Sequence, residues 1–105
     1  GLRAQWRLQE AGGRLRAPGD SVTLSCRASG FTLRHYDTWW YRLAPGGSLE
    51  RVSVIRFDST VLYFDQLVHG RATMSRDNSR SEVYLSLLSL QAQDSARYFC
   101  AVHTG

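Results

Sequence analysis

Two cysteines, Cys26 and Cys100, limit most strongly what this chain of 105 residues can fold into. They stand far apart, so they do not form the short CxxC spacing of metal sites and redox motifs. Each lies in a segment where apolar and polar residues alternate, which is the pattern of a half-buried strand. An even number of cysteines in such segments predicts one structural disulfide, made in an oxidising compartment.

A period of two continues along most of the chain, and no window shows a convincing helical period. Pro, Gly, Asn and Asp gather at 17–20, 44–47 and 76–79, where tight turns are expected. At most a single helical turn is expected, at 90–94. The pattern predicts an all-β sandwich of two sheets, with both cysteines pointing into the core. The inward positions that define these strands are Val22, Leu24, Cys26, Ala28, Ala72, Met74, Val83, Leu85, Leu87, Ala96, Tyr98 and Cys100.

The length of 105 residues and a hydrophobic content of 43% indicate one globular domain spanning 1–105, with 1–4 as an extension or linker. All thirteen basic residues are Arg, and the formal net charge is +4. They are spread along the chain among carboxylates, so a solvated surface is expected and no nucleic-acid partner. No apolar run approaches the roughly 20 residues that span a bilayer, so no membrane contact by the domain itself is expected. No cofactor or metal site is predicted.

Several motifs resemble the framework of antibody heavy-chain variable domains. The spacing of Cys26, Trp40 and Cys100 is the diagnostic one, and the stretch 94–100 resembles the immunoglobulin pattern D-x-A-x-Y-x-C. Segments 8–13, 28–32, 42–46 and 75–79 resemble the same framework in the same order. The resemblance implies an immunoglobulin V-type Greek-key sandwich in which Trp40 packs on the disulfide. It also implies a tyrosine corner at Tyr98 and an ion pair between Arg71 and Asp94.

The resemblance implies binding through three loops at one end of the sandwich, so the expected partner is a protein or other macromolecular antigen. The first loop is expected at 32–38, the second at about 56–63, and the third after Cys100. Aromatic residues would supply rigid contact area there, and charged residues would supply directional contacts. The candidate contact residues are Arg34, His35, Tyr36, Asp37, Arg56, Phe57, Asp58, Val61, Tyr63 and His103.

A possible face for pairing with a second chain is formed by outward residues of the middle strands, here Tyr41, Leu43, Leu49, Arg51 and Phe99. The heavy-chain pattern normally has Val where Tyr41 stands and a large buried Trp where Arg51 stands. Both departures resemble camelid single-domain antibodies, and burying Arg51 unpaired would be costly, so a conventional light-chain partner is disfavoured. The ending at 94–102 also resembles T-cell receptors, including the mu chains whose outermost variable domain stands alone.

The family normally continues into a last strand opened by W-G-x-G or F-G-x-G, and no such motif is present before Gly105. An unpaired edge is therefore expected on the strand of Phe99. The expected function is antigen recognition by an extracellular, stand-alone variable domain and not catalysis. Two alternatives stay open: a variable-type domain that pairs with a second chain, and a cell-adhesion or co-receptor domain with a fixed partner.

Overall fold

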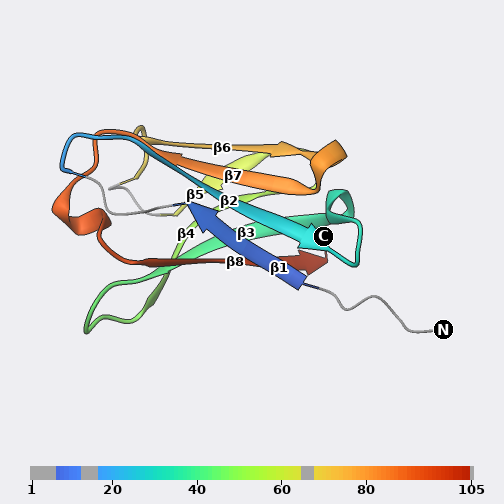
Figure 1. Cartoon of the computed structure of the whole chain (residues 1–105), viewed down its shortest axis with the longest axis horizontal. Coiled ribbons are helices and arrows are strands. Elements are labelled where there is room, and N and C mark those ends of the chain that lie inside the picture. Colours follow the sequence, from blue (N-terminus) through green and yellow to red (C-terminus); the bar gives the residue numbers. More distant parts are fainter. Residues whose placement is uncertain (1–6, 13–16, 65–67, 105) are drawn as a thin grey trace.

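The computed structural model describes residues 7–12, 17–64 and 68–104, which form two four-stranded antiparallel sheets packed face to face (Figure 1). One sheet has the strand order β1-β2-β7-β6 and the other β5-β4-β3-β8. Short 3-10 turns at Leu33–His35, Asn78–Arg80 and Ala92–Asp94 connect strands. The strands are β1 (Arg7–Gly12), β2 (Val22–Ser29), β3 (Tyr36–Leu43), β4 (Leu49–Ile55), β5 (Val61–Tyr63), β6 (Ala72–Asp77), β7 (Glu82–Leu87) and β8 (Arg97–Thr104).

The alternating residues of β2 and β7 form one wall of the core. In β2, Leu24 and Cys26 are buried while their neighbours in sequence point away from the core. They lie opposite Leu85 and Val83 of β7, which are fully buried. Side chains paired across neighbouring strands share a face of the sheet, so the period of two in both segments produces one apolar surface. The predicted all-β sandwich is confirmed.

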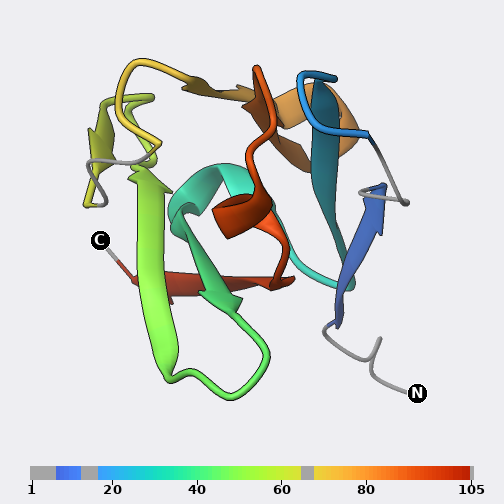
Figure 2. The same cartoon turned by 90° about the vertical axis from the view of Figure 1, so that its left-hand side faces the viewer.

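The predicted disulfide joins the two sheets. Cys26 lies in β2 and Cys100 in β8, and their Cα atoms are 6.3 Å apart across the sandwich. Trp40 of β3 is fully buried and belongs to the same core cluster as both cysteines. The view along the sandwich in Figure 2 shows the two layers that this bridge connects.

The predicted turns also form. The amide of Asp20 donates to the carbonyl of Ala17 at 3.1 Å, and the amide of Gly47 donates to that of Ala44 at 2.9 Å. Gly46 in the second turn has φ +72°, a left-handed conformation that glycine adopts without steric cost. The single helical turn expected near 90–94 is the 3-10 turn at Ala92–Asp94.

Candidate functional site

The end of the sandwich opposite the expected binding loops is held by an ion pair. Arg71 Nη1 donates to Asp94 Oδ2 at 2.9 Å and Nη2 to Oδ1 at 3.0 Å, which is a bidentate pair. The hydroxyl of Tyr98 donates to the carbonyl of Asp94 at 2.8 Å, and the amide of Gln91 donates to its Oδ2. Arg71 also donates to the carbonyls of Leu88 and Ser89. These contacts give Arg71, Asp94 and Tyr98 a structural role.

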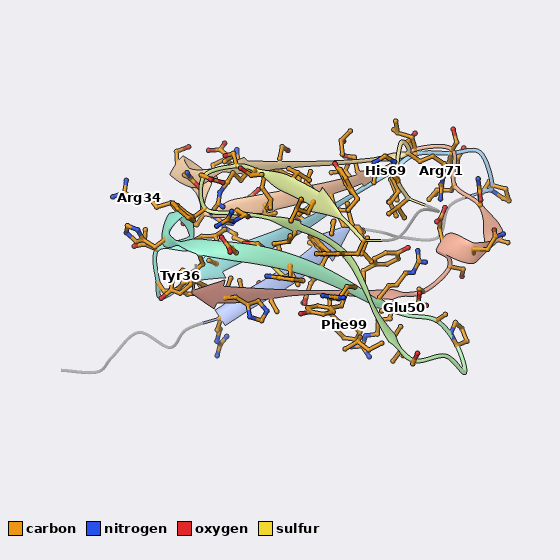
Figure 3. All side chains as sticks on the ribbon, turned by 180° about the vertical axis from the view of Figure 1, so that it is seen from behind. Arg34, Tyr36, Glu50, His69, Arg71 and Phe99 are labelled. Carbon is orange, nitrogen blue, oxygen red and sulfur yellow. A yellow bond between two sulfur atoms is a disulfide. The ribbon has the colours of Figure 1, made fainter. Side chains whose placement is uncertain are left out.

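Two opposing effects set the protonation of Asp94. Burial alone would raise the pKa of this carboxyl, but the hydrogen bonds from Arg71 and from the amide of Gln91, with the charge of Arg71, outweigh burial and lower the pKa. The carboxylate is therefore held ionised against the guanidinium. Figure 3 shows Arg71 near one end of the sandwich and Arg34 and Tyr36 at the other.

The first expected loop is shorter than the range 32–38. Only a 3-10 turn at Leu33–His35 precedes β3, and Tyr36 is already paired with β8. Arg34 and His35 are exposed, whereas Leu33 is fully buried and anchors the turn. Strand pairing extends further than expected because β3 lies between two neighbours, β4 and β8. Free contact area in this loop therefore centres on Arg34 and His35.

The second expected loop is a tight hairpin between β4 and β5. Arg56, Phe57 and Asp58 are exposed at its tip, and the amide of Arg56 donates to the carbonyl of Thr60 at 2.8 Å. Asp58 Oδ1 accepts the amide of Thr60, which lowers the pKa of Asp58. The hairpin is thus fixed by its own hydrogen bonds and presents a ring, a cation and an anion to solvent.

Val61 and Tyr63 do not lie on the solvent side of this hairpin as expected. They belong to β5, where register with Ile55 and Ser53 turns them toward the core, and both are half-buried against core clusters. The intervening Leu62 points outward and is 50% exposed. A strand forms here and not a loop. The alternation of side chains across the sheet therefore decides which residues face solvent and could contact a ligand.

The segment after Cys100 is also strand rather than loop. β8 continues to Thr104 in register with β3. His103 is exposed and its ring lies edge-on to Trp39 at a centroid distance of 5.3 Å. Within the described part of the chain, His103 is therefore the contact candidate that this segment offers.

Asp37 connects the first two loops. Its Oδ1 accepts the amide of Phe57 at 2.8 Å, and its Oδ2 lies 4.0 Å from Arg56 Nε. Its side chain is only 14% exposed. Asp37 therefore fixes the second loop against the first, although it was expected to contact the ligand directly.

Arg76 also contributes to the loop end of the sandwich, and no pattern in the sequence predicted this role. Its guanidinium donates to three main-chain carbonyls, those of Leu33 at 2.9 Å, Tyr36 at 3.3 Å and Arg56 at 2.7 Å. Its Nε donates to Asn78 at 2.9 Å. Burial lowers the pKa of Arg76 and the carboxylate of Asp37 opposes that shift. A single side chain thus ties both loops to the turn after β6.

The matching family model is that of the immunoglobulin V-set domain, and it covers residues 9–105. The chain belongs to the immunoglobulin V-set family. V-set domains are typically binding domains and not enzymes.

The five residues of the expected pairing face lie on the outer side of the second V-set sheet. Leu43, Leu49 and Arg51 are exposed, while Tyr41 and Phe99 are half-buried. Two aromatic neighbours, Trp39 and Phe64, were not included in the expected face, although they stack on each other at 5.2 Å. The alternation of inward and outward side chains along β3 could have predicted that Trp39 belongs to this face, because alternate residues share a side of the sheet and Trp39 stands two residues before Tyr41.

The expected unpaired edge of the V-set sheet is present in the described residues, because β8 is the last strand in the order β5-β4-β3-β8. The amide of Cys100 at this edge donates to Glu10 Oε1 of β1 at 3.1 Å. A cavity of about 490 Å³ beside it is lined by Leu24, Trp40 and Tyr98 among others. We assign no binding role to this cavity.

The three histidines of the chain occupy separate places. His35 is in the first loop. The ring centres of His69 and Tyr63 lie 6.1 Å apart, and the ring of His103 lies against Trp39. Over 7–12, 17–64 and 68–104, no group of three or more His, Cys, Asp and Glu could hold a metal ion. In the same ranges, the V-set domain has no helix that is long and apolar enough to cross a bilayer.

We expect replacement of Arg76 by Met to loosen both loops without unfolding the domain. Three carbonyls would lose a charged donor, so the free energy of unfolding should fall by about 1–3 kcal/mol. Amide hydrogen exchange at 33–37 and 56–60 should accelerate. Arg76→Lys should restore little of this protection, because an ammonium lacks the planar fork that reaches several carbonyls at once. The control is Arg80→Met on the neighbouring turn, and equal exchange in both variants would contradict the assignment.

Proposed function

We propose that this V-set domain is the variable domain of an adaptive immune receptor, and that it recognises a protein or other macromolecular antigen through its loop end. The observation that carries the proposal is the connection made by Arg76, which holds Leu33, Tyr36 and Arg56 at fixed distances. Loops on a rigid scaffold can change their exposed residues without refolding the domain, and they lose little entropy on binding.

The exposed residues at this end have the chemistry of a contact surface. Phe57 is 49% exposed and offers a rigid apolar anchor. Arg34, Arg56 and Asp58 surround it with charges that can make directional hydrogen bonds. His35 and His103 add polar rings at the same end. An apolar centre with a polar rim fits a protein surface better than a small apolar ligand.

We also propose that the domain recognises its antigen without pairing with a conventional light chain. Arg51 is exposed on the outer face of the second sheet, at the position where a heavy-chain partner interface would need a buried apolar residue. Burying an unpaired guanidinium costs several kcal/mol, so that interface is disfavoured. A single-domain antibody and the outer domain of a T-cell receptor mu chain both satisfy this condition, and both place the domain outside the cell.

The proposal is tested by binding the whole domain, displayed in many copies, to an array of secreted and cell-surface proteins. A genuine ligand should lose at least about tenfold in affinity with Arg34→Ala and Phe57→Ala together, since exposed anchors of this kind each contribute about 1 kcal/mol or more. Thr73→Ala, on the other sheet, is the matched control and should bind normally. The proposal would be contradicted by a ligand whose binding is lost in Thr73→Ala but unchanged in the variant with both Arg34→Ala and Phe57→Ala.

A further inference from the structure

A hollow lies on the β1-β2-β7-β6 sheet, between the end of β2 and the turn that joins β6 to β7. Its volume is about 600 Å³, which is within the range of sites that bind small ligands. The polar side chains that line it are those of Gln9, Arg27, Ser29, Ser79, Arg80 and Ser81. We call this feature the polar hollow.

The side chains that line the polar hollow carry positive charge and no negative charge. Arg27 and Arg80 are the two cations, and their side chains are 68% and 65% exposed. The other polar groups are three hydroxyls and one amide, which can donate hydrogen bonds to an anion without adding charge. A concave surface with charge of one sign attracts ligands of the opposite sign, so the lining favours an anion.

The two guanidiniums share one carboxylate and hold it loosely. Arg27 Nε lies 3.9 Å and Arg80 Nε lies 3.7 Å from the same oxygen, Oε1 of Glu82. These distances are too long for hydrogen bonds, and within the described ranges neither guanidinium donates one. Asp77 is also near Arg80, but its Oδ1 already accepts the amide and the hydroxyl of Ser79. Both arginines therefore keep donors that a ligand can use.

The backbone around the polar hollow is fixed by its own hydrogen bonds. Ser81 has φ +53°, a left-handed conformation, and its amide donates to the carbonyl of Asn78 at 3.2 Å. Its carbonyl accepts the amide of Ala28 in β2 at 2.9 Å. These bonds attach the turn to the end of β2, so the lining needs little ordering when a ligand binds.

From these observations we infer that the polar hollow binds a sulfate ester carried on a saccharide. The guanidiniums of Arg27 and Arg80 bind the sulfate oxygens through charge-assisted hydrogen bonds, and the surrounding hydroxyls and amide bind the hydroxyls of the sugar. An acidic peptide fits less well, because peptide recognition relies on a buried apolar or aromatic anchor. Among the described residues that line the hollow, only Ala28 is apolar. This site and its ligand are separate from the antigen proposed for the loop end.

The test is a calorimetric titration of the whole domain with a chondroitin sulfate tetrasaccharide and with the same tetrasaccharide without sulfate. Both carry carboxylates, so the comparison isolates the sulfate. We expect the sulfated form to bind about tenfold more tightly, since charge-assisted hydrogen bonds are the strong ones. Equal affinity for the two forms would overturn the inference.

Two double variants separate the site from the net charge. Arg27→Gln with Arg80→Gln should remove the preference for sulfate, and both side chains are exposed, so the domain should stay folded. Arg51→Gln with Arg97→Gln on the other sheet removes the same charge and should leave the affinity unchanged. An equal loss in both variants would show that net charge alone attracts the saccharide, which contradicts the inference.

The contribution of the hydroxyls is tested with Ser29→Ala and Ser81→Gly together. Glycine keeps the left-handed backbone at position 81. The sulfated tetrasaccharide should bind about fivefold more weakly, because two hydrogen-bonding groups are lost. The matched control is Thr23→Ala with Ser86→Ala, a pair of hydroxyls on the same sheet outside the hollow, which should bind normally.

Two further measurements separate this inference from its alternatives. The loop variant with Arg34→Ala and Phe57→Ala should bind the sulfated tetrasaccharide normally, so the loop-end proposal and this inference can fail independently. A phosphoserine tetrapeptide presents the same tetrahedral oxyanion on a peptide and should bind more weakly than the sulfated tetrasaccharide. Tighter binding of the phosphopeptide would overturn the assignment to a saccharide.

Discussion

Removal of the Cys26–Cys100 disulfide should cost about 2–5 kcal/mol of unfolding free energy. The bridge closes most of the chain into one loop, which restricts the unfolded state by about 4 kcal/mol in the entropy model. Both cysteines also belong to the core cluster around Trp40, so Ala at both positions leaves space in a packed region. Guanidinium denaturation followed by tryptophan fluorescence measures the loss.

The control for this experiment is the unmodified chain with its disulfide reduced. It should lose a similar amount of stability, because reduction removes the same constraint while leaving both side chains in place. A loss below about 1 kcal/mol in both samples would show that packing of the two sheets alone holds the domain together.

Replacement of Asp94 by Ala should cost about 3–5 kcal/mol, because it leaves the guanidinium of Arg71 without the carboxylate that it binds through two hydrogen bonds. It also removes the acceptor for the amide of Gln91. The expected value is large because the side chain of Asp94 is only 3% exposed. Asp77→Ala is the matched control: that carboxylate accepts from Ser79 in an exposed turn, and its loss should cost about 1 kcal/mol.

The Asp94 carboxylate should also make the free energy of unfolding fall at acid pH. The pKa of Asp94 is lower in the folded state than in the unfolded chain, so its contribution to stability is complete above the unfolded pKa of about 4. As the pH falls through the lower folded pKa, the carboxylate becomes protonated and that contribution is lost. In Asp94→Asn, the free energy of unfolding should therefore fall less between pH 7 and pH 2.5, as measured by denaturation at a series of pH values. An equal fall in this variant and in the unmodified domain would mean that other carboxylates dominate acid unfolding.

Alternation and turn chemistry were enough to predict the sandwich. Leu24, Cys26 and Leu85 are buried as the period of two requires, because each strand has one face against the core. The disulfide followed from the placement of both cysteines in inward positions. The pairing of Arg71 with Asp94 followed only from family resemblance, since nothing local to either residue indicates a partner so distant in sequence.

The loop end was harder to predict because long-range contacts determine it. Arg76 stands in a segment that is typical of a turn, and its three carbonyl partners come from parts of the chain that only the fold brings together. Val61 and Tyr63 were expected in a loop, but pairing with β4 draws them into a strand and turns them inward. Phe64 stacks on Trp39 for the same reason: the neighbour is set by sheet order and not by sequence distance.

The central claim is that antigen is recognised at the loop end, and an exchange footprint tests it most directly. The whole domain would be bound to its strongest ligand from the protein array, and amide hydrogen exchange compared with the free domain. The account predicts slowed exchange at 33–37 and 56–60, with the outward residues of β2 and β7 unchanged. Protection confined to β2 and β7, with both loops exchanging as in the free domain, would contradict it.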